Sequence, residues 1–213
     1  MRSRTRALLQ KSSTATLTTQ LHKRNIRSCY MSGVRPLTPS TQPIVGPAYT
    51  LRYIPYREDH DSLENLSNET TPSRLAIENC PPGSVLVADA RGLSTCATLG
   101  DILAHRLKAR GVAGFVSDGA VRDSAALGQA GLPIYCSGAA APASLNGHIP
   151  IETQVPIACG EVAVYPDDIV VADADGVVIV PKSIAEEISQ PAAEQEDIEE
   201  FIALLVRQGH PIA

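Results

Sequence analysis

Residues 100–123 read GDILAHRLKARGVAGFVSDGAVRD, and this stretch predicts a helix, a strand and a turn in close succession. Apolar side chains recur at helical spacing over residues 102–110, and Gly111 follows as a C-terminal stop. The apolar face of this helix comprises Ile102, Leu103 and Leu107. The apolar run 112–116 then predicts a short buried strand, which a turn signal at 118–119 ends.

Arg122 and Asp123 lie just past the carboxyl end of that strand, where ligands bind in open α/β sheets. The helix start at Gly100 suits a carboxylate, because free N–H groups point outward and no side chain blocks the approach. Arg122 offers a planar fork of donors to an anion, and Asp123 offers an oxygen ligand to Mg²⁺. The alternative is a loop salt bridge in which Asp123 caps a helix beginning near Ser124.

The spacing of these residues resembles the signature of the RraA-like family. The pattern is Asp101, twenty residues and then Arg122-Asp123, together with Val112-Ala113-Gly114, Asp118-Gly119, Leu132-Pro133-Ile134 and the stretch 173–181. This family includes the class II 4-hydroxy-4-methyl-2-oxoglutarate/4-carboxy-4-hydroxy-2-oxoadipate aldolases and the regulator of RNase E activity. The similarity runs from about Ser13 to Pro181. It implies an α/β fold, a β/β/α sandwich of the swivelling-domain type, assembled as a homotrimer or hexamer.

The resemblance also implies roles for individual residues. Asp123 would bind Mg²⁺, Mn²⁺ or another divalent cation, and Arg122 would contact the substrate and steady an enolate. Asp101 would order a metal-bound water, while the backbone of Gly100, Ile102 and Leu103 would hold the substrate carboxylate. The chain departs from the aldolase pattern in one place. An acid follows Arg-Asp after two further residues in the aldolases, and Ala126 stands there in this chain, as in the regulator branch, which also lacks that acid.

We therefore expect a divalent-metal-dependent lyase that acts on small 2-oxo acids through a pyruvate enolate. Retro-aldol cleavage of substrates of the 4-hydroxy-4-methyl-2-oxoglutarate type and decarboxylation of oxaloacetate both produce this enolate. The alternative is a non-enzymatic regulatory binding protein similar to the RNase E regulator. The N-terminal helix and the charged segment 55–71 make the chain longer than a minimal regulator, which favours the enzyme.

Length and composition are those of one compact domain, since 213 residues with 44% hydrophobic content can bury a sizeable core. We expect a flexible extension over residues 1–12 and a single domain with a C-terminal helix over 13–213. The sequence has neither an apolar run of membrane-spanning length nor a signal-peptide pattern, so we expect a cytoplasmic protein without a membrane partner. The five scattered cysteines suit a reducing compartment and offer no zinc site.

Charge is uneven along the chain. Residues 1–57 contain ten of the eighteen Lys and Arg and no acid, whereas the remainder is strongly acidic. A basic start among Ser and Thr is typical of a mitochondrial presequence, which is the alternative to a cytoplasmic location. The net charge of −5 and the lack of aromatic residues among the basic ones argue against a nucleic-acid partner.

The remaining patterns predict further elements. Helices are expected over Thr16–Ile26 and Pro72–Asn79, strands over Ala48–Ile54 and Ser84–Asp89, and a β-hairpin over 169–180 with Asp173 and Asp175 at its turn. Ser183 and Glu186 suggest a capping box, and a helix over Glu194–Arg207 is expected after a break at Pro191. Residues 55–71 are interpreted as a solvated loop, or alternatively as a lid or an intersubunit contact over the site. Asp89 and Arg91 are interpreted as structural, although both could line the site crevice.

Overall fold

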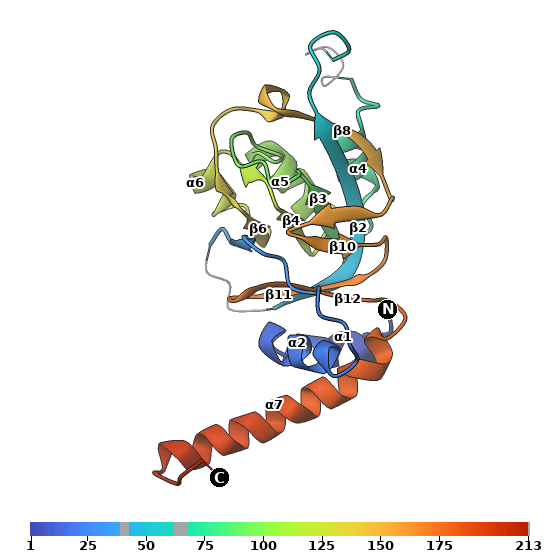
Figure 1. Cartoon of the computed structure of the whole chain (residues 1–213). Coiled ribbons are helices and arrows are strands. Elements are labelled where there is room, and N and C mark those ends of the chain that lie inside the picture. Colours follow the sequence, from blue (N-terminus) through green and yellow to red (C-terminus); the bar gives the residue numbers. More distant parts are fainter. Residues whose placement is uncertain (39–42, 62–67, 213) are drawn as a thin grey trace.

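A mixed sheet forms the centre of the fold in the computed structural model, which describes residues 1–38, 43–61 and 68–212 (Figure 1). Within these residues the sheet has eight strands, in the order β1-β6-β4-β3-β2-β11-β12, and β8 also pairs with β2. The strands are β1 (Arg35–Pro36), β2 (Ile44–Pro55), β3 (Val85–Asp89), β4 (Gly114–Ser117), β6 (Ile134–Cys136), β8 (His148–Thr153), β11 (Ile169–Asp173) and β12 (Gly176–Val180). The pairs β2–β3, β3–β4 and β4–β6 are parallel, and the others are antiparallel.

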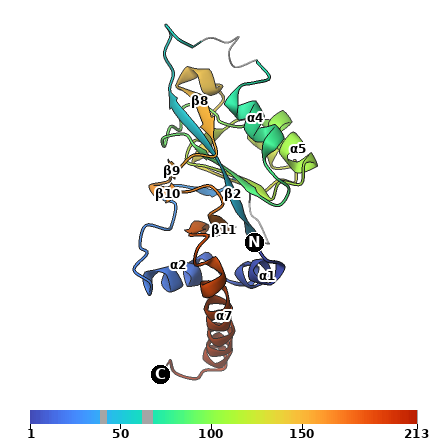
Figure 2. The same cartoon turned by 90° about the vertical axis from the view of Figure 1, so that its right-hand side faces the viewer.

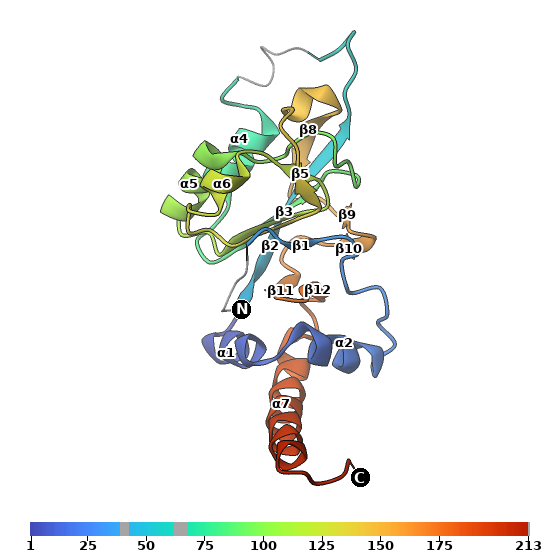
Figure 3. The same ribbon diagram turned by 90° about the vertical axis from the view of Figure 1, so that its left-hand side faces the viewer.

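Alternating side chains of the parallel strands fill two separate cores. Leu86 and Phe115 point toward three helices, α4 (Pro72–Asn79), α5 (Asp101–Ala109) and α6 (Ser124–Leu127), which cover one face of the sheet (Figure 3). Val87 and Val116 point the other way, toward a small sheet formed by β9 (Ile157–Cys159) and β10 (Val162–Val164). Strands covered on both faces are apolar throughout, as this sequence shows. The predicted α/β class and layered sandwich are confirmed.

Three helices lie beyond the β11–β12 hairpin and form a third core with it (Figure 2). They are α1 (Ser3–Lys11), α2 (Thr14–His22) and α7 (Ala185–Arg207). Leu9, Leu17 and Ile188 are fully buried there against the hairpin. Residues 3–11 thus form an ordered helix where we expected a flexible extension, because Leu9 has an apolar surface to cover. The predicted boundaries of the domain itself stay a prediction.

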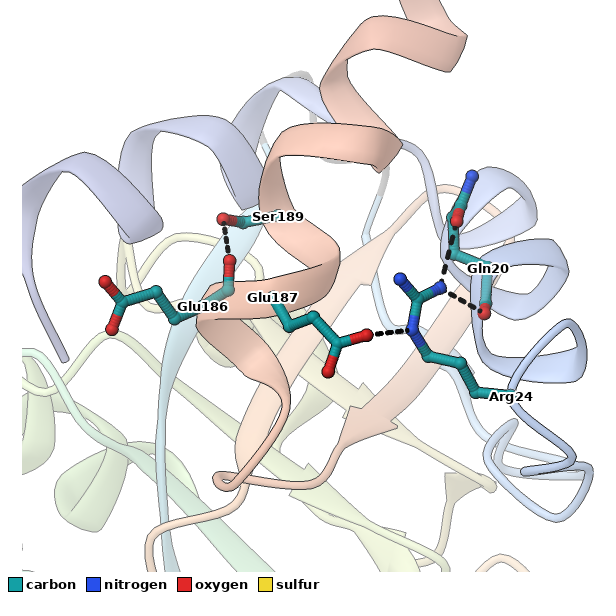
Figure 4. A network of polar contacts seen from close by, with 5 residues as sticks. All are labelled: Gln20, Arg24, Glu186, Glu187 and Ser189. Atoms are coloured by element: carbon teal, nitrogen blue, oxygen red, sulfur yellow. Dashed lines mark hydrogen bonds and ion pairs between the residues drawn. The ribbon is translucent and has the colours of Figure 1, made fainter.

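Ion pairs also link these helices and account for part of the uneven charge of the sequence. Arg2 forms an ion pair with Glu186 and Lys11 with Asp197, so the basic start of the chain lies along the acidic α7. Figure 4 shows the corresponding contact of α2, in which Arg24 Nε donates to Glu187 at 2.7 Å while its Nη1 donates to the Gln20 carbonyl. Three of the basic residues near the start of the chain, Arg2, Lys11 and Arg24, therefore pair with acids of α7.

Backbone capping adds to this attachment. The Ser13 hydroxyl accepts a hydrogen bond from the Thr16 N–H and caps α2, and the Ser13 N–H donates to Glu196 at 2.6 Å. Partial burial alone would raise the pKa of Glu196, but the hydrogen bonds from Ser13 and Thr16 outweigh it and lower the pKa. Glu196 is therefore ionised at neutral pH and ties α7 to the junction of α1 and α2.

Two predictions for the C-terminal region were wrong. Helix α7 runs without a break through Pro191, and no side chain caps its start at Ile184, so Ser183 and Glu186 form no capping box. Proline removes one backbone hydrogen bond. The buried neighbours Ile188, Ala192 and Ala193 nevertheless hold the helix on the hairpin, and the Ser189 hydroxyl donates to the Glu186 carbonyl at 2.9 Å (Figure 4).

Other predicted elements agree with the structure within a few residues. Helix α4 has the predicted bounds, β2 is longer than predicted, and α2 ends early because Asn25 adopts a left-handed conformation with φ of 62°. Asp173 and Asp175 lie at the hairpin turn, as predicted. Within the segment 55–71, Arg57 pairs with Asp59 at the surface, and residues 62–67 lie outside the described part of the chain.

Small elements complete the described chain. They are β5 (Ala120–Val121), which pairs with β7 (Gly138–Ala139), and a short 3₁₀ helix (Ser144–Asn146). All five cysteines are buried free thiols. No helix in the described ranges has both the length and the apolarity needed to cross a membrane.

Leu9→Ala tests whether α1 belongs to the folded domain. Removing this fully buried side chain should lower the free energy of unfolding by about 2–5 kcal/mol, measured by urea denaturation. Gln10→Ala, next along the same helix and exposed, should change it by no more than about 0.5 kcal/mol. Equal small effects of both substitutions would show that α1 does not pack on the hairpin in solution.

Candidate active site

Backbone pairing brings the two halves of the predicted site together. The segment before α5 lies along β5, where Thr98 N–H donates to the Ala120 carbonyl at 2.9 Å and Arg122 N–H donates to the Leu99 carbonyl at 3.0 Å. Ala97 and Ala120 also form a parallel bridge. Because of this pairing, Gly100 and the start of α5 lie directly beside Arg122 and Asp123.

Gly100 is in close contact with both predicted functional side chains. A Cβ atom at this position would lie 2.9 Å from Asp123 Oδ2 and 3.3 Å from Arg122 Nε. The φ of Gly100 is −124°, which any residue can adopt, so the requirement for glycine comes from space and not from backbone conformation. The structure therefore brings Gly100, Arg122 and Asp123 together, as the sequence predicted.

Arg122 and Asp123 also contact each other. Arg122 Nε lies 3.1 Å from Asp123 Oδ2, and both side chains are about half exposed. Asp123 has a left-handed backbone, with φ of 57° and ψ of 37°, which is uncommon for a residue other than glycine and occurs often at functional sites. Its side chain makes no capping hydrogen bond to α6. The alternative interpretation predicted a salt bridge between Arg122 and Asp123 together with a helix cap by Asp123. The structure has the salt bridge and lacks the cap.

Asp101 begins α5 and uses its carboxylate locally. Asp101 Oδ1 accepts a hydrogen bond from the Ile102 N–H at 2.8 Å. A ligand carboxylate that binds the Ile102 N–H must therefore displace Asp101, whereas the Leu103 backbone lies in the same first turn, where N–H groups have no partner within the helix.

The predicted apolar face of α5 was wrong for Ile102, which is 78% exposed at the rim of the site. Ala104 and Leu107 are the buried residues of this helix, with Leu103 partly buried against the same core. The helix is rotated so that its first turn faces the site, and His105 is exposed. An apolar side chain is thus presented where a ligand or a neighbouring protein would approach.

Two hollows meet at Asp101, Arg122 and Asp123, which line both of them. One, of about 630 Å³, extends toward α6 and is otherwise lined by Ser124, Ala125, Ala126, Ala139, Ala140 and Ala141. The other, of about 340 Å³, extends toward the start of α4. Ala126 therefore occupies part of the wall of the site, and the acid missing from this position would have projected near Asp123.

The donor set around Asp123 fits a hard divalent cation that keeps most of its water. The described residues contain no group of three or more His, Cys, Asp or Glu side chains placed to share a metal. Mg²⁺ is commonly bound by one or two carboxylates together with waters and substrate oxygens. Asp123 and Asp101, which line the same hollows, fit this mode of Mg²⁺ binding. They do not form the cage of protein ligands that zinc prefers.

Two buried carboxylates hold the loops that surround the site. Asp118 accepts hydrogen bonds from the N–H groups of Ala90 at 2.7 Å and Gly92 at 2.9 Å, and burial raises its pKa. Asp89 accepts from Arg91 N–H at 2.9 Å and from Ala158 N–H at 3.2 Å, which confirms a structural role. Sequence reasoning treated Asp118 only as a turn residue. An acid directly after a buried strand was the signal for this role.

His148 lies buried beneath the smaller hollow. Its ring centre is 4.5 Å from that of Tyr53, which lines the hollow, and neither ring nitrogen has a hydrogen-bond partner in the described chain. Burial lowers the pKa of His148 to about 4, so the ring is neutral at physiological pH. It supports Tyr53 from behind and does not line the hollow itself.

The sequence and the fold are both similar to known proteins. A protein of Halalkalibacterium halodurans named "Putative 4-hydroxy-4-methyl-2-oxoglutarate aldolase" is 38% identical over 165 residues, which are 78% of this chain and 72% of that protein. The structure of Streptomyces coelicolor RraAS2, described as an unusual member of the RNase ES inhibitor RraA family, is 37% identical, with a TM-score of 0.82 over 95% of this chain and 97% of that one.

A further solved structure, of an uncharacterized protein from Pseudomonas syringae pv. tomato, has 26% identity and a TM-score of 0.85, and the match covers 99% of this chain and 96% of that one. The family model described as RraA-like, Aldolase/RraA, matches residues 14–179. This range contains the paired segments around Gly100 and Arg122 and the complete central sheet except the last residue of β12. The chain belongs to the RraA-like family.

Proposed function

We propose that this protein is a divalent-metal-dependent lyase of 2-oxo acids that works through a pyruvate enolate. The observation that carries the proposal is the contact of a side-chain-free Gly100 with the Arg122–Asp123 pair at a helix N-terminus. An anion, a cation and a substrate oxygen could meet in the adjoining hollows, which Asp101, Arg122 and Asp123 line. The aldolase name of the 38% identical relative supports the same reaction class.

Each residue of the site has a proposed role that follows from its position. Asp123 would hold the cation, which supplies a Lewis acid for the keto group of the substrate. The first turn of α5 would bind the substrate carboxylate, because its N–H groups and the helix dipole favour an anion. Arg122 would neutralise the negative charge that develops on the enolate oxygen. Asp101, once the substrate has displaced it from the Ile102 N–H, would orient a water and move a proton.

The two reactions need different proton transfers. In retro-aldol cleavage the bond between C3 and C4 breaks, its electron pair enters the enolate, and the C4 hydroxyl must lose its proton. In oxaloacetate decarboxylation the bond to the leaving carboxylate breaks and CO₂ departs, with no hydroxyl proton to remove. Because Ala126 supplies no acid to the wall of the site, we expect decarboxylation to be the more efficient of the two.

A regulatory binding protein is the second candidate function. The similarity to RraAS2 supports it, as do the alanine in place of an acid at position 126 and the exposed Ile102, which would suit a protein partner. We propose a homotrimer or hexamer for either function, and the cytoplasmic location stays a prediction.

Asp123→Ala tests the proposed lyase. Purified protein should release pyruvate from oxaloacetate, and more slowly from 4-hydroxy-4-methyl-2-oxoglutarate, in the presence of Mg²⁺ or Mn²⁺ and not with a chelator. Asp123→Ala should abolish this release, since it removes the cation ligand. Asp59→Ala removes an acid from another exposed Arg–Asp pair and should leave the rate unchanged. Folded protein without turnover on either substrate would favour the regulatory function.

Ala126→Glu tests the role of the missing acid. If the acid carries the hydroxyl proton, this variant should raise kcat for aldol cleavage by about 10²-fold or more and change oxaloacetate decarboxylation much less. The ratio of the two rates in one protein preparation is the measurement, because it cancels differences in folded fraction. A variant that binds metal but gains no aldol cleavage would contradict this role for the position.

A further inference from the structure

The smaller hollow connects the candidate active site with the first turn of α4. Its lining begins at Gly100, Arg122 and Asp123 and reaches Ser73 and Arg74. Its volume of about 340 Å³ lies at the lower end of the range for small-molecule sites, about 300–1,000 Å³. A ligand held at Arg122 can therefore extend along this hollow toward Arg74.

Arg74 is an exposed cation without a counter-ion in the described part of the chain. Its natural partner would be Glu78, four residues later on the same helix. Glu78 is instead bound by Arg106, with distances of 2.9 Å and 2.7 Å to its two oxygens, and lies 3.5 Å from Arg110. The hydrogen bond to Arg106 lowers the pKa of Glu78, so that carboxylate is ionised and already paired.

The other arginine of the hollow is paired locally. Arg122 forms an ion pair with Asp123, whereas Arg74 lines the hollow without an ion pair to any described residue. Ser73 and Ser144 add hydroxyl groups to the same end. A guanidinium with free donors binds carboxylate in a two-point arrangement. The end of the hollow at α4 thus favours a second negative group on the ligand.

We propose that Arg74 binds the distal carboxylate of a 2-oxo dicarboxylic acid whose 2-oxo carboxylate lies at the start of α5. This inference rests on the proposed function and assigns the residue that binds the second carboxylate of its substrates. Arg74 is a specificity residue here, because it contacts the carboxylate at the opposite end of the substrate from the 2-oxo carboxylate. It makes the site select 2-oxo diacids over 2-oxo monoacids of the same length.

A matched pair of ligands tests this assignment without turnover. 2-Oxoglutarate and 2-oxopentanoate have the same chain length and differ in the terminal carboxylate. Isothermal titration calorimetry with Mg²⁺ present should show about 10- to 100-fold tighter binding of 2-oxoglutarate by the unchanged protein. Arg74→Gln should remove this preference while leaving 2-oxopentanoate affinity unchanged. Arg27→Gln removes the same charge at another exposed position, outside the hollow, and should retain the preference.

The outcomes separate this inference from the proposed function. A preference that disappears only in Arg74→Gln supports the distal-carboxylate role even in a protein that releases no pyruvate, and in that case the lyase proposal alone fails. Equal binding of the two ligands by the unchanged protein, binding of neither, or a preference that survives in Arg74→Gln would overturn the role of Arg74. In an active enzyme, the variant should raise KM for 4-hydroxy-4-methyl-2-oxoglutarate, whose distal carboxylate is retained in the product, more than it lowers kcat.

Discussion

The backbone pairing of residues 97–99 with β5 is the constraint on which the site depends. The two hydrogen bonds of Thr98 N–H and Arg122 N–H fix the start of α5 against the end of β5. A Cβ atom at Gly100 would lie 2.9 Å from Asp123 Oδ2, so a side chain there would displace the Asp123 carboxylate. Asp118 fastens the neighbouring loop through Ala90 and Gly92, so both sides of the site are anchored to the ends of parallel strands. A rigid backbone frame therefore presents a small number of exposed polar groups.

Charged residues near the start of the chain pair with acids of α7 and so link these helices. The basic N-terminal residues and the acidic face of α7 attract each other across a separation of more than 180 residues in sequence, and surface pairs of this kind contribute little individually. Their effect depends on the buried contacts of Leu9, Leu17 and Ile188, which provide most of the stabilisation of this layer. In the central region, Arg74 has no ion-pair partner among the described residues, and its neighbour Glu78 is paired with Arg106 instead.

Sequence patterns predicted the local elements well where periodicity and turn residues agreed. Helix α4, the 169–180 hairpin and the strands at the centre of the sheet follow from alternation and from glycine and proline positions. The approach of Gly100 to Asp123 followed from the family spacing and from the location of strand ends. The short distance that a Cβ atom at Gly100 would have to Asp123 Oδ2 could be seen only in the structure.

The failures of prediction share a physical cause, which is that tertiary contacts override local preference. Pro191 does not end α7, because buried neighbours hold the helix in place. Ile102 is apolar and yet exposed, because the rotation of α5 is set by its packing through Ala104 and Leu107. The roles of Asp118 and Arg74 depend on groups that are distant in sequence. No local sequence pattern shows whether a charged side chain is paired.

The central claim is that Asp123 holds a divalent cation in the hollows that it lines beside Gly100. The most direct measurement is Mn²⁺ binding, followed by electron paramagnetic resonance and water-proton relaxation, in the unchanged protein and in Gly100→Ala. The unchanged protein should bind Mn²⁺ with several exchangeable waters, and Gly100→Ala should lose that binding while retaining its fold, because the added Cβ would crowd Asp123 Oδ2. Equal Mn²⁺ binding by both proteins would contradict the account.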